Sequence, residues 1–380
     1  MDNNLLGNIK YTSNLIFANV NRLITSHRSV GIYGYGIYAE RIVKRLNKWS
    51  VSVDFYVIDD KYYDKSMPDN VIKISDLNKY DRSIIIIGFE TLIGREKLLI
   101  ETKKKIYAYA PYTEILDFEH CYIDFDAITY DYILENNEVF QDTFDLLEDD
   151  YSRRVMIEYL NNCISGRSED FCLLNQDCEH DYDYDLLFSK KNNGGVIIEC
   201  GAFTGKTAVE IADYLKQKND SDNKILALEP DDVNYEILCD RIKGYNNICA
   251  VKKGVSDKDG EVVFDFQGGS GSTVVNENEL KDDCDYSKIE VSTINSLMKE
   301  YGNIYSIMMD IEGSELQALM GGEEVFQDRP SLAVRVYHKK NDLIVIPQFL
   351  RDLKIKPQYK LYLRNSQSTR GPLDLTLYAL

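Results

Sequence analysis

The chain has 380 residues, which is longer than one hydrophobic core usually supports, so we expect two domains. Its net charge of −19, from 63 acidic and 44 basic residues, argues against binding a phosphate backbone, so we expect no nucleic-acid partner. Because the chain has no apolar run of 18 residues and no signal-peptide pattern at its start, we expect a cytoplasmic protein without a membrane span.

The first third of the chain alternates strand and helix patterns. "SVGIYGYG" predicts a strand that ends in a glycine turn, and Ala39, Ile42, Val43 and Leu46 then follow helical spacing. "VSVDFYVIDD" predicts a second strand, and "SIIIIGF" a third that is apolar on both faces. These elements predict a small parallel sheet over about residues 26–118, within a Rossmann-like α/β domain at 1–120.

The glycine turn after the first strand has the spacing Gly34-x-Gly36-x-x-Ala39, and Asp59 ends the next strand. Such glycines let a backbone approach a pyrophosphate, and an acid at the second strand accepts bonds from ribose hydroxyls. The hypothesis is a nucleotide site at Gly34, Gly36 and Asp59. The alternative is a turn kept only for close packing of helix on strand.

A helical and acidic segment follows, at residues 121–192. "YDYILENNEVFQDTFDLLEDDYSRRVMIEYLNNCI" has no Pro or Gly, and its apolar residues recur at helical spacing. The eight cysteines include Cys172 and Cys178 near His180, but no C-x2-C pair is present, so we expect reduced thiols and no zinc. This segment is interpreted as a helical connection between two domains.

A larger α/β domain is predicted at 193–380. Strands are expected at 196–200, 225–229, 247–251, 261–266, 304–310 and 331–336. "YKLYLRN" and "LDLTLYAL" then close the chain as an antiparallel hairpin. A mostly parallel sheet that ends in such a hairpin is typical of class I methyltransferases, whose fold is Rossmann-like.

The turn in "VIIECGAFTGKT" differs from the N-terminal one. Glu199 precedes Gly201 and Gly205, and this G-x-x-x-G spacing suits a ligand without a pyrophosphate. S-adenosylmethionine is such a ligand: its ammonium needs a carboxylate, and its ribose hydroxyls need an acid, which Glu229 offers at the end of "ILALEP". The alternative is two acids that end neighbouring strands by chance.

From about Leu146 to Leu380 the chain resembles the FkbM-type methyltransferases, including those with an N-terminal Rossmann-like domain. The resemblance lies in "LLEDDYSRR", "VIIECGAFTGKT", "LALEPDDVNYEIL", "VKKGVSDKDGEVVF", "GGSGSTVV", "MMDIEGSELQALMGG" and "LAVRVYHKKNDL". It implies an S-adenosylmethionine-dependent O-methyltransferase for a sugar, polysaccharide precursor or natural product. It also implies that Asn234, Ser256 and Asp257 join the cofactor site.

Methyl transfer to a hydroxyl requires an aligned acceptor oxygen and removal of its proton. Asp310 ends the strand "IYSIMMD" and is a candidate base or a ligand of a divalent cation that polarises the acceptor. His338 follows the next strand and is an equally good candidate base. We expect both side chains to face the cofactor.

Three residues depart from the family pattern: Met308 replaces a Lys, Lys206 an acid, and Asn295 an Asp. They support the alternative of a non-catalytic nucleotide- or nucleotide-sugar-binding assembly module on a degenerate methyltransferase scaffold. A redox enzyme with NAD at the Gly34 turn is a third reading, but no hydride-transfer motif accompanies it. These motifs do not identify the acceptor, which is expected to be a small molecule or a glycan, or the oligomeric state. The segment 126–190 and the loop 267–275 are expected to cover the acceptor.

Overall fold

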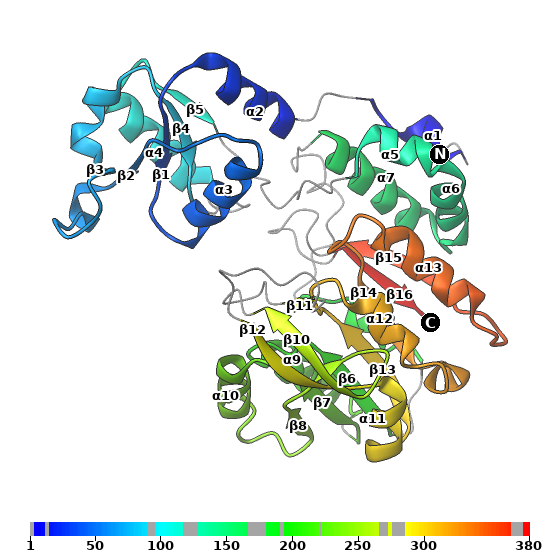
Figure 1. The fold of residues 1–380 in the computed structure, drawn as a ribbon. Coiled ribbons are helices and arrows are strands. Elements are labelled where there is room, and N and C mark those ends of the chain that lie inside the picture. The colour runs from blue at the N-terminus through cyan, green and yellow to red at the C-terminus, as the bar shows by residue number, and fades with distance from the viewer. Residues whose placement is uncertain are drawn as a thin grey trace.

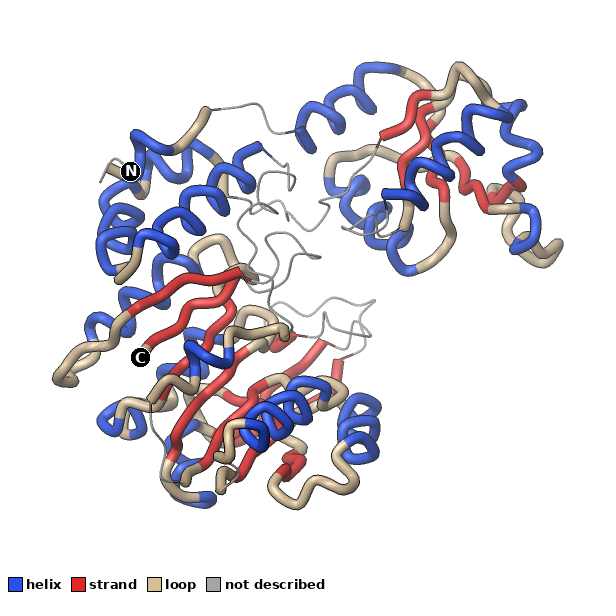
Figure 2. Tube along the Cα trace, turned by 180° about the vertical axis from the view of Figure 1, so that it is seen from behind, coloured by secondary structure: helices blue, strands red, loops and turns tan. Residues whose placement is uncertain are grey.

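The computed structural model describes residues 4–11, 15–89, 96–116, 128–165, 180–190, 194–220, 222–265, 273–275, 286–365 and 375–380. Two sheet-containing bodies are seen (Figures 1 and 2). The expected α/β fold class is confirmed. None of the helices in these ranges is both long enough and apolar enough to cross a membrane.

The N-terminal body is built on a parallel sheet of five strands in the order β3-β2-β1-β4-β5. Its strands are β1 (Val30–Tyr33), β2 (Phe55–Ile58), β3 (Val71–Lys73), β4 (Ile84–Ile87) and β5 (Glu114–Leu116). Its helices are α2 (Leu15–Ser26), α3 (Ile37–Lys48), η1 (Asp60–Tyr62), η2 (Ile74–Tyr80) and α4 (Glu96–Tyr109).

Strand β4 shows why the run of four isoleucines forms a buried strand. Ile84 and Ile86 pack with α2 and α3, while Ile85 and Ile87 pack on the other face with η2 and α4. Successive side chains of a strand point to opposite faces, so a sheet covered on both sides needs an unbroken apolar run. Both faces of the N-terminal sheet are therefore hydrophobic cores.

The C-terminal body holds a seven-stranded sheet in the order β15-β16-β14-β13-β6-β7-β8. The strands are β6 (Val196–Cys200), β7 (Lys224–Leu228), β8 (Ile248–Val251), β13 (Ile304–Met309), β14 (Ser331–Arg335), β15 (Leu361–Asn365) and β16 (Leu375–Ala379). All run in the same direction except β16, which pairs antiparallel with both β14 and β15. The predicted terminal hairpin is confirmed.

Helices and a second sheet complete this body. The helices are α9 (Lys206–Gln217), α10 (Asp232–Arg241), α11 (Ile294–Tyr301), α12 (Glu315–Met320), η5 (Val325–Asp328) and α13 (Asp342–Asp352). The small sheet has the order β11-β10-β12-β9, from β9 (Gly254–Val255), β10 (Gly260–Asp265), β11 (Thr273–Val275) and β12 (Tyr286–Ser292). The loop expected to cover the acceptor lies outside the described residues at 267–272, and antiparallel β10 and β11 flank it.

The predicted helical segment forms α5 (Tyr130–Glu135), α6 (Asn137–Leu146), α7 (Asp150–Ser165) and α8 (Tyr184–Leu187). Helix α7 packs on β15, and the backbone N–H of Glu148 donates to the Leu361 carbonyl at 2.9 Å. A short helix α1 (Leu5–Asn8) contacts α6 (Figure 1). These helices share the core of the large sheet, while the domain boundaries at residues 120 and 192 stay predictions. Cys172 and Cys178 lie outside the described residues.

Candidate functional site

The turn between β6 and α9 needs both of its glycines for the fold. Gly201 has φ of 81°, and a β-carbon there would overlap the carbonyl oxygen of Asp310. Gly205, with φ of 77°, is the N-cap of α9, and a β-carbon there would lie 2.5 Å from Leu238. Because Gly201 has no side chain, the end of β6 approaches the end of β13 closely, and the Asp310 N–H donates to Cys200 at 3.1 Å.

Glu199 and Glu229 lie at the carboxyl ends of the paired strands β6 and β7, and both are buried, at 5% and 6% exposed. Burial raises the pKa of Glu199 well above its usual range. No residue that the structure describes forms a hydrogen bond with Glu199 Oε2. A buried carboxylate oxygen without a partner is costly, so this atom is an acceptor available to a ligand cation.

Glu229 is held by the backbone around it. Its Oε2 accepts the N–H of Phe203 at 2.8 Å, and its Oε1 accepts the N–H of Asp231 at 3.0 Å. Burial raises the pKa of Glu229 to about 7, although these N–H groups and the Asn234 side chain oppose the shift. The carboxylate keeps acceptor capacity beyond these contacts, as binding of a ribose hydroxyl requires.

The other two residues implied by the family resemblance have contacts farther along the chain. Ser256 Oγ donates to Asp257 Oδ1 at 3.1 Å, and Gln317 of α12 donates to the same oxygen at 3.0 Å. The Ser256 N–H donates to Ser292 of β12. These contacts join β9, α12 and the small sheet, and a role in cofactor binding stays a prediction.

A second cluster lies beside the glycine turn, at the ends of β13 and β14. Its members are Asp310, Glu312 and His338, whose potential ligand atoms all lie within 4.8 Å of one another. His338 Nε2 is 3.3 Å from Asp310 Oδ1 and 3.7 Å from Glu312 Oε2. Glu312 has φ of 52°, a left-handed conformation uncommon outside glycine, and strained backbone of this kind occurs often at functional sites.

His338 is enclosed by acids. Its side chain is 8% exposed, and its Nδ1 lies 2.9 Å from Oε1 of Glu315, which is fully buried and also accepts the Ile311 N–H. Burial lowers the pKa of His338, but the charges of Glu315 and Asp310 outweigh it and raise the pKa well above the usual value. These acids therefore favour the protonated imidazole, and a role of His338 as a base stays a prediction.

Arg335 is a further member of the site that the sequence reasoning missed. It is 2% exposed, and its Nε lies 3.6 Å from Asp310 Oδ2. Its Nη1 donates to Thr376 of β16 at 2.7 Å, and the guanidinium lies 4.2 Å from the ring centre of Tyr182. An Arg within the otherwise apolar strand "SLAVR" was the available signal, since a buried cation needs a partner.

The three departures from the family pattern have identifiable surroundings. Met308 is 1% exposed and packs in the core beneath α9, so the positive charge beside Asp310 comes from Arg335 instead. Lys206 lies 3.4 Å from the carboxylates of Asp181 and Glu210. Asn295 Oδ1 accepts the backbone N–H groups of residues 324 and 325, next to η5. Asn295 therefore has a structural role.

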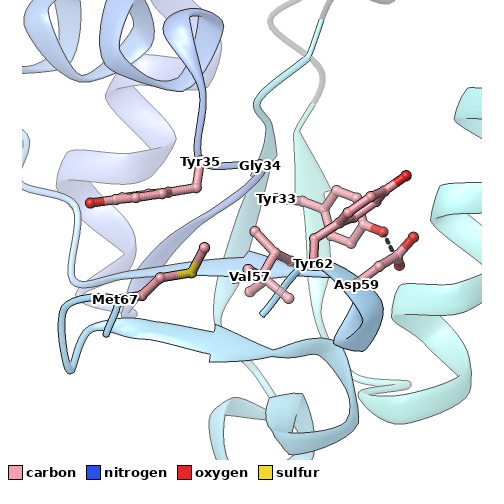
Figure 3. Close-up of a pocket in the computed structure, with 8 residues that line it drawn as sticks. Tyr33, Gly34, Tyr35, Val57, Asp59, Tyr62 and Met67 are labelled. Carbon is pink, nitrogen blue, oxygen red and sulfur yellow. Dashed lines mark hydrogen bonds between the residues drawn. The ribbon is translucent and has the colours of Figure 1, made fainter. Parts of the chain in front are cut away.

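The N-terminal candidates Gly34, Gly36 and Asp59 belong to the other sheet. A cavity of about 310 Å³ lies at the carboxyl ends of β1 and β2 (Figure 3). Gly34 and Asp59 line this cavity, and Gly36 is the N-cap of α3.

Comparisons with known proteins bear on the C-terminal body above all. Residues 188–356 match the family model of the methyltransferase FkbM domain. Among solved structures, the chain is similar to a methyltransferase FkbM from Methylobacillus flagellatus KT, with a TM-score of 0.67 and 21% identity over 96% of this chain and 93% of that one. It also matches SMU.1697c from Streptococcus mutans in complex with SAH, at 12% identity and a TM-score of 0.32 over 52% of this chain and 94% of the other. No curated protein sequence matches the chain.

Proposed function

We propose that the protein is an S-adenosylmethionine-dependent O-methyltransferase, because residues 188–356 match the family model of the methyltransferase FkbM domain. Its acceptor is a hydroxyl of a sugar, polysaccharide precursor or natural product. When bound, the cofactor supplies an electrophilic methyl group on a sulfonium. The chain's own residues bind it, orient the acceptor oxygen and take the acceptor's proton.

The observation that carries the proposal is the pair of buried acids beside the β6 turn. The unpartnered Oε2 of Glu199 suits an ammonium group, which would remove the cost of burying the carboxylate. The anchored carboxylate of Glu229 suits the two hydroxyls of a ribose. Both side chains lie where open parallel sheets bind ligands, outside the carboxyl ends of the strands.

Asp310 is the proposed base for the acceptor hydroxyl. Its side chain is 35% exposed and therefore reachable, whereas the His338 side chain beside it is 8% exposed. His338 Nε2, 3.3 Å from Asp310 Oδ1, and Arg335 Nε, 3.6 Å from Asp310 Oδ2, fix the orientation of the carboxylate. His338 is thus proposed as the residue that positions Asp310. The sequence had suggested His338 as a candidate base as good as Asp310.

A divalent cation at Asp310, Glu312 and His338 is the second form of this proposal. One imidazole nitrogen and two carboxylates are a common donor set for catalytic metals. Glu315, 2.9 Å from His338 Nδ1, stands where a carboxylate orients a metal-binding histidine. In this form the three side chains would hold the cation, and the cation would polarise the acceptor hydroxyl.

Isothermal titration with S-adenosylhomocysteine tests the cofactor assignment. We expect Glu199→Gln and Glu229→Gln to weaken binding by about 1–3 kcal/mol each, the cost of a lost hydrogen bond to a charged group. Glu261→Gln, whose side chain on β10 is 65% exposed, is the matched control and should bind as the wild type does. Absence of binding to the wild type at about millimolar ligand would refute the enzyme assignment and leave the scaffold alternative.

Turnover with a panel of sugars and nucleotide sugars, followed by release of S-adenosylhomocysteine, tests the second cluster. Asp310→Asn should lower turnover by about 10²- to 10⁴-fold while S-adenosylhomocysteine binding stays nearly intact. Adding a chelator to the wild type separates the two forms, because Asp310 acting as a base needs no cation. Full activity of Asp310→Asn would eliminate both forms.

A further inference from the structure

The cavity of the N-terminal body is separate from the methyl-transfer site. It has a volume of about 310 Å³ and opens outside the carboxyl ends of β1 and β2 (Figure 3). The sheet order places β2 and β3 on one side of β1, and β4 and β5 on the other. In doubly wound sheets the crevice beside such a reversal is where ligands bind.

The two glycines of the turn differ in what the fold requires of them. Gly34 has φ of 129°, and a β-carbon there would lie 2.8 Å from the Gly88 carbonyl oxygen, so the fold itself demands glycine. Gly36 has φ of −127°, which every residue adopts, and a β-carbon there would meet no atom within 4 Å. The fold does not demand glycine here, and its absent side chain leaves the position open to an approaching ligand.

Gly36 is the N-cap of α3, a helix of 12 residues, and offers no side chain to its first N–H groups. Asp, Asn or Ser is the usual choice for an N-cap, because the side chain satisfies one of those groups. A helix start whose N-cap offers neither a capping side chain nor a β-carbon is suited to a phosphate oxygen. The cavity next to it supplies room for the rest of such a ligand.

Asp59 provides an acceptor at the other end of the cavity. Its Oδ1 accepts from Tyr33 Oη at 2.6 Å and Lys105 Nζ at 3.2 Å, and its Oδ2 accepts from Lys105 at 2.9 Å. A carboxylate has about four acceptor positions, so one remains on Oδ2. Tyr33 and Lys105 fix the carboxylate in one orientation, as recognition of a sugar hydroxyl requires.

The walls of the cavity are aromatic and apolar. Tyr35 and Tyr62, which line it, are 45% and 65% exposed, and Val57 and Met67 complete the lining shown in Figure 3. Exposed aromatic faces stack on bases regardless of base type. The volume is near the lower end of the roughly 300–1,000 Å³ range for ligand pockets, which favours one nucleoside over a dinucleotide.

We propose that this cavity binds one nucleoside diphosphate group, with its phosphates at the start of α3, a ribose hydroxyl on Asp59 and its base against Tyr35 and Tyr62. The diphosphate is either free or linked to a sugar, since both share the recognised chemistry. This site is independent of methyl transfer, and its failure would leave the proposed function untouched.

Isothermal titration of the full chain with UDP and ADP, with and without an attached sugar, tests the site. Gly36→Ala should keep the wild-type thermal midpoint, because the added methyl meets no protein atom, and should weaken diphosphate binding by about tenfold or more. Asp59→Asn should weaken binding similarly, and a 2′,3′-dideoxy nucleotide should be insensitive to that change. Asp76→Asn, in an exposed ion pair of the same body, is the matched control and should bind as the wild type does.

Several results would overturn the proposal. These are no binding of any diphosphate, unchanged binding in Gly36→Ala, or NAD binding more tightly than ADP. Loss of nucleotide binding in Glu199→Gln would place the nucleotide in the methyl-transfer site instead. Adenosine, which has no phosphate, is expected to bind Gly36→Ala and the wild type equally; a loss there would show that the variant disturbs more than the phosphate contact.

Discussion

The affinity for S-adenosylhomocysteine is expected to rise as pH rises through neutrality. The pKa of Glu229 is raised to about 7 by burial, so at pH 6 this carboxyl is mostly protonated and at pH 8 mostly ionised. Ribose hydroxyls donate to the ionised form, whereas the protonated form offers one acceptor fewer. Binding therefore selects the ionised protein, and its affinity scales with the ionised fraction.

The magnitude follows from that fraction. With a pKa of about 7, roughly one molecule in eleven is ionised at pH 6 and ten in eleven at pH 8, so the dissociation constant should fall about tenfold, or by about 1.4 kcal/mol. The raised pKa of Glu199 acts in the same direction and steepens the change. Tenfold is therefore the least that the wild type should show.

Isothermal titration at the two pH values measures the effect. Glu199→Gln should keep about the tenfold change, because Glu229 is intact, and Glu229→Gln should lose that part of it. A wild-type dissociation constant that differs by less than about twofold between pH 6 and pH 8 would refute the reasoning. So would a pH dependence that is identical in the wild type and Glu229→Gln.

The ligand-free protein should show the opposite trend. The folded-state pKa of Glu229 is above its usual value of 4.5, so its protonated form stabilises the fold at low pH. This contribution is fully present below pH 4.5 and is lost as pH rises through about 7, by at most about 3 kcal/mol. Urea unfolding of wild type and Glu229→Gln side by side isolates it, because all other titrating groups are shared.

The remaining predictions concern stability and are measured by urea unfolding. Gly201→Ala should lower the free energy of unfolding by about 2 kcal/mol or more, from left-handed strain and overlap with the Asp310 carbonyl; an unchanged midpoint would contradict that geometry. Asp149→Ala should cost about 2–3 kcal/mol, because Arg364, 9% exposed at its side chain and 2.7 Å from the carboxylate, loses its ionic partner. Asn295→Ala should lower the free energy of unfolding by about 1–2 kcal/mol, because two hydrogen bonds to backbone N–H groups are lost. A decrease no larger than that caused by replacing an exposed Asn with Ala would contradict the structural role.

The strand ends that carry the site were predictable because their patterns are local. Continuous apolar runs that end in Glu199, Glu229 and Asp310 predict buried parallel strands with acids at one edge of the sheet. Strands β3 and β5 were not predicted, because three residues are too few to show a period of two. In the small sheet only β10 was predicted: β9 and β11 are as short, with two and three residues, whereas β12 has seven residues and was missed.

The raised pKa of His338 could not be predicted from the sequence. It depends on Glu315, three residues after Glu312, which has a left-handed backbone conformation. The fully buried carboxylate of Glu315 lies 2.9 Å from the imidazole of His338. The sequence places these two residues 23 positions apart, and only the fold shows that the acid outweighs the effect of burial on the pKa of His338. The nearness of Asp310 to the Gly201 turn, in contrast, follows from the parallel pairing of β6 with β13.

The contact of α1 with α6 makes the N-terminal sheet an insertion rather than a leading domain. The Leu5 N–H donates to Gln141 Oε1 at 2.8 Å, and the Lys10 N–H donates to Asn161 Oδ1 at 2.7 Å, so residues 5–10 pack on the C-terminal body. Trimming the chain from its first residue would thus uncover the fully buried Leu5 site before it removed any strand. A smaller methyltransferase would be made by excising the inserted sheet and joining residue 11 to residue 128 through a flexible peptide, which keeps α1 in place.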